Sequence, residues 1–177
     1  YGSKQNLIKK INLNLIGKHN VLNATAAIAV CLNIGVKINL IKTALKNFSG
    51  VERRLTKIFQ RGKIEFYDDY AHHPTEIQAV LDGLSKVYKK RKIISIFQPH
   101  RYSRIKNLKN DFASSFSKTD KVVLCPIYAA GEKKTFNFKQ IKFAKLIKKK
   151  SNIQVIVINN EIELKKYLQK NLYSNEI

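Results

Sequence analysis

From residue 54 onward, short apolar runs alternate with longer segments of helical periodicity, and this alternation constrains the fold more than any other feature. The runs at 64–67, 92–97, 121–125 and 153–158 are each followed by a segment whose apolar residues recur every three or four positions. Strands that alternate with helices form a mostly parallel sheet covered by helices. The sequence therefore predicts a Rossmann-like α/β domain.

The chain before this domain has a different pattern. Apolar and polar residues alternate over 11–15, which predicts a strand, and two helical segments follow over 19–33 and 38–48. We interpret residues 1–48 as the end of a separate domain and residues 49–177 as the α/β domain. The elements expected in that domain are an antiparallel strand pair (55–59 and 64–67), helix 74–88, strand 92–97, helix 105–118, strand 121–125, helix 137–150, strand 153–158 and helix 161–172.

Two features predict that the chain is part of a longer protein. It contains no methionine, even at position 1. The strand–helix rhythm also stops after a helix, so we expect the sheet to lack its last strand.

The composition excludes fewer functions than the order of the predicted strands and helices does. The net charge is +22, which raises the alternative of a basic nucleic-acid-binding domain. The lysines are spread along the whole chain, however, and no aromatic residues interleave with them to stack bases. The two cysteines lie in apolar runs, which favours a reducing compartment, and no apolar stretch is long enough to span a membrane.

Scarce polar residue types gather in the segments that follow the predicted strands. The first of these segments, 68–76, reads Asp-Asp-Tyr-Ala-His-His-Pro-Thr-Glu, and Pro74 suits the first position of a helix. The second, 98–104, carries one histidine and two arginines. Ligands of open α/β sheets bind outside the carboxyl ends of the strands. These loops are therefore the predicted ligand site.

Local chemistry leaves some roles in the first loop open. Asp69 could accept hydrogen bonds from a ribose, or it could cap the helix that follows, and the two interpretations are about equal. Asp68 is a second candidate, but neighbouring strand residues point to opposite faces. Aspartate and histidine are also metal ligands, yet adjacent histidines cannot easily reach one ion. We predict no metal site in this chain.

The second loop gives a stronger signal for an anion. Arginine binds carboxylates and phosphates through two parallel donors, and this loop contains Arg101, Arg104 and His100 in a chain that uses lysine nearly everywhere else. At the start of the helix over 19–33, Asn20 and Asn23 share a face and could read the edge of a base, although an asparagine such as Asn20 is more commonly a helix cap. The chain has no GxxxxGK[ST] phosphate loop.

Five blocks of sequence, at 17–27, 48–54, 68–77, 97–104 and 128–132, resemble the Mur ligases in order and spacing. The resemblance is strongest to the members that add L-alanine, and it runs from about residue 5 to the end. It implies an ATP- and Mg²⁺-dependent cytoplasmic ligase of three domains. Such an enzyme joins L-alanine to UDP-N-acetylmuramic acid through an acyl phosphate during peptidoglycan synthesis.

The resemblance also implies roles for individual residues. Asn20 and Asn23 match contacts to the adenine side of ATP, Arg54 matches an arginine near the phosphates, and Asp69 matches the ribose contact. The residues that match the surroundings of the alanine and the acyl phosphate are Tyr70, His72, His100, Arg101 and Arg104. Among these, His72, His100 and Arg104 are the candidates for catalytic residues.

By this resemblance residues 1–48 are the end of the central ATP-binding domain and residues 49–177 are most of the C-terminal amino-acid-binding domain. Other parts of the family pattern lie outside this chain: the uridine-nucleotide domain, the phosphate loop, the catalytic lysine and the magnesium ligands. We therefore expect the chain to need the N-terminal domains of the same enzyme for activity. An alternative is the murein tripeptide ligase of peptidoglycan recycling, which has a similar Asp-Asp-x-Ala-His-His-Pro block. Its second loop differs from the Gln-Pro-His-Arg-Tyr of this chain, which favours the alanine-adding enzymes.

Overall fold

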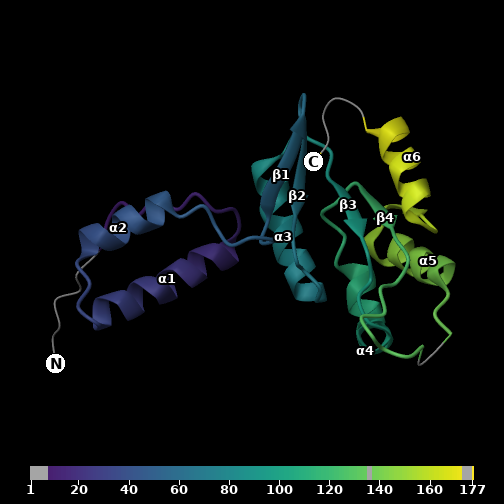
Figure 1. The fold of residues 1–177 in the computed structure, drawn as a ribbon, viewed down its shortest axis with the longest axis horizontal. Helices are drawn as coiled ribbons and strands as arrows, with labels where there is room; N and C mark the ends of the chain where they lie inside the picture. The colour runs from purple at the N-terminus through teal and green to yellow at the C-terminus, as the bar shows by residue number, and fades with distance from the viewer. Residues whose placement is uncertain (1–7, 135–136, 173–176) are drawn as a thin grey trace. The chain divides into compact units, whose positions relative to one another are not determined.

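The computed structural model describes residues 8–134, 137–172 and 177 (Figure 1). It divides the chain into two compact units, residues 1–51 and residues 52–177. Each unit is described by itself below. The interpretation of the first unit as the end of an ATP-binding domain stays a prediction.

The first unit contains the two predicted helices, α1 (Lys18–Asn33) and α2 (Ile38–Asn47). The predicted strand over 11–15 is wrong, because residues 8–17 form no strand. Their side chains still alternate between half-buried and exposed at positions 11–15. The alternation was real, but a strand also needs a partner for its backbone groups, and the described part of this unit offers none.

Gly17 is the N-cap residue of α1. Its φ of 106° is in the left-handed region, and a Cβ atom there would lie 2.6 Å from Cε1 of His19. Only glycine fits this position without strain. Asn20 is not the helix cap; its side chain instead donates to the carbonyl of Ile16 at 2.7 Å.

The second unit begins with a hairpin. Strands β1 (Thr56–Arg61) and β2 (Ile64–Asp68) pair antiparallel, as predicted, with an irregularity between Lys57 and Phe59. Helix α3 (Pro74–Val87) follows, with Pro74 in its first turn as the sequence predicted.

The parallel sheet of the second unit has the order β3-β4-β5, formed by Ile94–Phe97, Lys121–Leu124 and Gln154–Val157. Ile94, Lys121 and Gln154 are aligned with one another, so the three strands end level. The loops after β3, β4 and β5 therefore emerge at one edge of this sheet, whereas the loop over 69–73 follows β2, which belongs to the separate two-stranded sheet. The remaining helices are α4 (Tyr102–Ser114), α5 (Gln140–Ser151) and α6 (Glu161–Asn171).

The core of the second unit is aromatic and aliphatic. Phe97 lies at the end of β3 with its ring centroid 5.7 Å from that of Phe112 and 5.1 Å from that of Phe116. Further side chains complete this core from β4, α4 and α5: Ile105, Val122, Leu124, Phe143 and Ile147. This packing fixes the strand ends on which the candidate site is built. None of the described helices is both long and apolar enough to cross a membrane.

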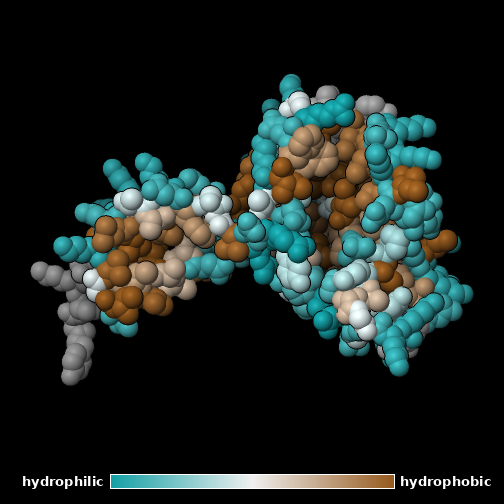
Figure 2. Space-filling view, in the orientation of Figure 1, coloured by the Kyte–Doolittle hydropathy of each residue, from teal (hydrophilic) through white to brown (hydrophobic). Residues whose placement is uncertain are grey.

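An apolar hollow of about 240 Å³ lies beside β2 and β3. Apolar side chains line it from several elements, among them Phe66, Ile96 and Leu168 (Figure 2). Ile177 also lines the hollow, donating to the carbonyl of Lys92 and accepting from the N–H of Ile94. These two bonds follow the pattern of a parallel strand pair, so Ile177 extends the pairing of β3 on the side away from β4.

A polar cluster anchors the start of β2. Glu65 accepts hydrogen bonds from Arg91 at 2.6 Å and from the hydroxyl of Tyr67 at 2.8 Å, and Lys57 lies 3.2 Å away. The Arg91 bond is the main reason that the pKa of Glu65 falls to about 2. Burial, together with the hydroxyl of Tyr88 2.6 Å away, raises the pKa of Tyr67.

This cluster gives a pH-dependent stability. The pKa of Glu65 is lower in the folded than in the unfolded chain, so its contribution is complete at neutral pH and is lost as the pH falls from about 4.5 toward 2. We expect the unfolding free energy to drop by about 1 kcal/mol between about pH 7 and pH 4 through this group. Glu65→Gln should remove that pH-dependent part in denaturant titrations, whereas Asp82→Asn, at an exposed site on α3, should leave it. An unchanged acid limb in the Glu65 variant would contradict the assignment.

Candidate active site

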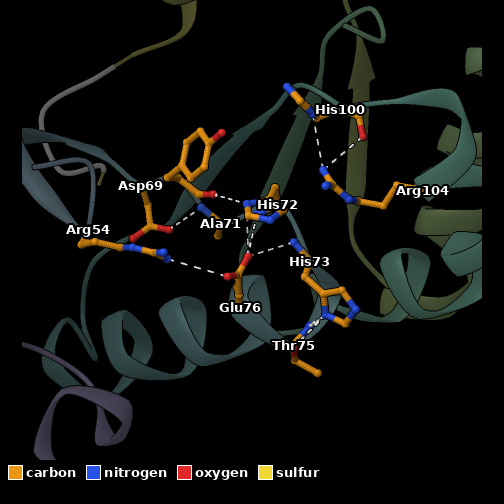
Figure 3. Close-up of polar contacts among 10 residues, drawn as sticks. Arg54, Asp69, Ala71, His72, His73, Thr75, Glu76, His100 and Arg104 are labelled. Atoms are coloured by element: carbon orange, nitrogen blue, oxygen red, sulfur yellow. Dashed lines mark hydrogen bonds and ion pairs between the residues drawn. The ribbon is translucent and has the colours of Figure 1, made fainter. Parts of the chain in front are cut away.

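The loop between β2 and α3 is held by one carboxylate. Oε2 of Glu76 accepts from the backbone N–H groups of His72 at 2.9 Å and of His73 at 3.0 Å. Oε1 of the same side chain lies 3.7 Å from Arg54 (Figure 3). Burial opposes the ionisation of Glu76, but these donors and the nearby cations outweigh it and lower its pKa. Glu76 thus links the histidine pair to Arg54.

The two adjacent histidines have different roles. His73 is the N-cap of α3, and its Nδ1 lies 2.8 Å from the hydroxyl of Thr75 (Figure 3). His72 places Nδ1 at 2.9 Å from the carbonyl of Tyr70. A carbonyl only accepts, so this Nδ1 carries a proton, and Oε2 of Glu76 lies 3.5 Å from the same nitrogen. His73 is thus a structural residue, whereas His72 is a candidate proton acceptor through the Nε2 of its neutral tautomer.

Both carboxylate oxygens of Asp69 accept hydrogen bonds from backbone N–H groups. Its Oδ2 accepts from the N–H of Leu55 at 2.7 Å, and its Oδ1 accepts from the N–H of Ala71 at 2.7 Å. Burial raises the pKa of Asp69, although these two bonds oppose it. Neither aspartate caps α3, since His73 does, and Asp68 lies 3.4 Å from Nε of Arg53. The ribose role of Asp69 stays a prediction, and each oxygen keeps a lone pair that could accept a further bond.

The second cationic segment differs from the prediction in one respect. The expected loop over 98–104 ends early, because α4 begins at Tyr102 instead of residue 105 and so carries Arg104 in its first turn. Arg101 makes this possible with a φ of 70°, which turns the chain directly into the helix. A left-handed conformation is uncommon outside glycine, and no local pattern indicates it here.

His100 and Arg104 form a pair. Nη1 of Arg104 lies 3.4 Å from both Nδ1 and the carbonyl oxygen of His100 (Figure 3). Burial and the charges of Arg104, Arg101 and His72 lower the pKa of His100. The imidazole is therefore neutral at neutral pH, and its Nδ1 accepts from the guanidinium.

The structure gathers most of the candidate residues at one end of the second unit. His72 acts electrostatically on His100, and its ring lies 5.1 Å from that of Tyr70, which is 45% exposed. Arg54 and Asp69 reach the same loop through Glu76 and Ala71. Asn20 and Asn23 lie on α1 in the other unit, and the two units are not placed relative to each other.

Sequence reasoning assigned no role to Glu76 or Glu132. Glu76 could have been found, because a glutamate three residues after a helix cap is the usual partner in a capping box. Glu132 follows β4 and binds Ser103, which lies 29 residues earlier. No local pattern predicts such a contact.

The chemistry of the site suits a small anionic ligand. Arg101 and Arg104 provide cationic groups, of which Arg104 is held by His100, and His72 lies on the neighbouring loop. Among the described residues, no group of three or more histidine, cysteine, aspartate or glutamate side chains could hold a metal ion.

Comparison with known proteins assigns the chain to a family. Residues 53–174 match the family described as "Mur ligase, glutamate ligase domain". The chain belongs to the Mur ligase family. It is 49% identical over 176 residues to the UDP-N-acetylmuramate–L-alanine ligase of Pelagibacter ubique, covering 99% of this chain and 38% of that protein. The corresponding ligase of Ruthia magnifica is 42% identical over 171 residues, covering 94% of this chain and 36% of that one.

Solved structures agree with this assignment. The UDP-N-acetylmuramate–alanine ligase of Thermotoga maritima has a TM-score of 0.77 at 30% identity, covering 94% of this chain and 34% of that structure. A murein peptide ligase from Psychrobacter arcticus has a TM-score of 0.64 at 26% identity, with the same coverage of 94% and 34%. This Mur ligase chain therefore spans little more than a third of the length of the relatives that it matches.

Proposed function

We propose that this chain is the C-terminal part of an ATP-dependent ligase that joins L-alanine to UDP-N-acetylmuramic acid. The observation that carries the proposal is that the His100–Arg104 pair at the start of α4 lies near His72 on the neighbouring loop, where His72 would act as the proton acceptor. An amino acid presents a carboxylate and an ammonium group, and these two loops offer a partner for each. The names of the relatives supply the identity of the amino acid and of its acceptor.

In this proposal the two arginines hold the carboxylate of alanine, and His72 takes the proton that the ammonium must lose before the amine can attack. Neutral His100 supports the Arg104 guanidinium without adding a competing charge. ATP with Mg²⁺ supplies the phosphoryl group that activates the carboxylate of UDP-N-acetylmuramic acid. Toward ATP, this chain would contribute Arg54, Asp69 and the α1 residues Asn20 and Asn23.

The four residues proposed to contact ATP differ in how free their side chains are to bind it. Asn23 is exposed and Arg54 is half exposed, so both can reach a ligand. Asp69 and Asn20 already bond to the backbone, which leaves each with part of its hydrogen-bonding capacity. We therefore rank Arg54 and Asn23 above Asp69 and Asn20 as ATP contacts.

A chimera tests the proposal. The N-terminal domains of the Pelagibacter ubique ligase, joined to this chain in place of the matching region, should release phosphate from ATP in a reaction that requires both L-alanine and UDP-N-acetylmuramic acid. The 177-residue chain alone, which has no GxxxxGK[ST] phosphate loop, is the negative control. A folded chimera that uses a murein tripeptide but not alanine would favour the recycling ligases instead. A folded chimera without any ligase activity would contradict the proposal.

A further inference from the structure

The N-terminus of α4 receives its cap from another loop. Arg101 is the N-cap residue, but its side chain makes no capping hydrogen bond, and the first turn of α4 contains no acidic residue. The carboxylate comes instead from Glu132, on the loop after β4. Oε2 of Glu132 accepts from the N–H of Ser103 at 3.0 Å, and Oε1 accepts from its hydroxyl at 2.6 Å.

Backbone contacts join the same two loops. The N–H of Arg101 donates to the carbonyl of Tyr128 at 2.8 Å, and the N–H of Tyr128 donates to the carbonyl of Pro99 at 2.8 Å. The ring of Tyr128 also lies 5.2 Å from the ring of His100. The loop after β4 therefore holds the segment before α4 at several points.

Two left-handed residues show that this arrangement is maintained against local preference. Arg101 has a φ of 70° and Ala130 a φ of 50°, and Gly131 completes the turn that brings Glu132 back to the carbonyl of Ala129. Such conformations cost free energy outside glycine and persist where surrounding contacts fix them. The two hydrogen bonds from Ser103 to Glu132 join the segment that contains Arg101 to the turn that contains Ala130.

We propose that Glu132 is a positioning residue, which caps α4 from the neighbouring loop and thereby fixes the backbone that carries His100, Arg101 and Arg104. Arg104 follows Ser103 directly, so the direction of its side chain depends on the first turn that Glu132 binds. Because the Glu132 carboxylate occupies donors at this helix end, the ligand anion is left to the arginine side chains. The functional half of this inference rests on the proposed function, whereas the capping half does not.

Amide hydrogen exchange in the 177-residue chain tests the capping half. Glu132→Ala should speed exchange at Ser103 about tenfold or more, because the closed state loses its acceptor. The order of the Arg104 side chain, measured by relaxation of its Nε–Hε group, should fall in the same variant. Glu132→Gln keeps one acceptor oxygen and should recover part of both losses. Unchanged exchange and unchanged Arg104 order in Glu132→Ala would overturn the inference.

Kinetics of the chimera test the functional half. Glu132→Ala should raise the KM for alanine about fivefold, with the KM for ATP changed less than about twofold, as expected for an interaction that orients only one ligand's site. The matched control is Glu163→Ala, which removes a glutamate that accepts from Asn159 at the start of α6. It should alter neither constant. Faster exchange with an unchanged alanine KM would show a cap without a positioning role and would overturn the proposal. If the unsubstituted chimera is inactive, the proposed function fails, and the exchange and Arg104 measurements still decide the inference.

Discussion

Arg104→Lys in the chimeric enzyme is expected to raise the KM for alanine about tenfold or more, a loss of about 1.4 kcal/mol or more in binding. Lysine keeps the charge but replaces a planar fork of donors with a single point charge. It also cannot reproduce the contact of Nη1 with both Nδ1 and the carbonyl of His100. The KM for ATP should change much less, since its contacts are assigned to Asn20, Asn23, Arg54 and Asp69.

Steady-state kinetics with each substrate varied in turn decide this prediction. Lys106→Arg is a useful control, because it exchanges the same two residue types two positions further along α4 without touching the cationic pair. It should leave both constants unchanged. If the KM for ATP rises in Arg104→Lys and the KM for alanine does not, the assignment of Arg104 to alanine is wrong.

The sequence predicted the order and type of the α/β elements well, because each depends on local periodicity. Apolar runs such as 121–125 can hardly be other than buried strands when helical segments flank them on both sides. The histidines and arginines that follow β2 and β3 also lie near one another in the structure, while their role as a ligand site stays a prediction. The edge of a parallel sheet brings together the loops that follow its strands, which accounts for the loops after β3 and β4, whereas the loop after β2 follows a strand of the separate hairpin.

The failures have a common cause in contacts that sequence patterns do not encode. Residues 11–15 alternate like a strand but have no partner in the described part of their unit. The early start of α4 depends on the left-handed Arg101, which is held by Tyr128 and, through Ser103, by Glu132. Asp69 does not cap α3, which was the alternative to a ribose contact, because its carboxylate accepts from the backbone of Leu55 and Ala71 and His73 is the cap. In each case the structure depends on a contacting residue, or on the lack of one, that the local sequence pattern does not predict.

Asp69→Asn is expected to lower the unfolding free energy of the 177-residue chain by about 2–3 kcal/mol. The carboxylate accepts one backbone N–H on each oxygen, at 2.7 Å in both cases. Asparagine offers only one oxygen, so its amide group must face either Leu55 or Ala71, donor against donor. Losing a hydrogen bond to a charged group and leaving a partly buried donor without an acceptor would together cost more than this, and removing the charge, whose burial raises the pKa of Asp69, offsets part of the loss.

Urea titrations with an unchanged m-value would attribute the loss to stability rather than to a different unfolded state. Asp68→Asn is the matched control, because its partly exposed ion pair with Arg53 should contribute less than about 1 kcal/mol. The same two variants in the chimera then separate the roles of Asp69. A lower stability with an unchanged ATP KM, measured below the unfolding transition, would make Asp69 a residue that only holds the loop. A raised ATP KM in Asp69→Asn but not in Asp68→Asn would support the ribose contact, since the carboxylate that binds Leu55 and Ala71 would then also use its remaining lone pairs on the nucleotide.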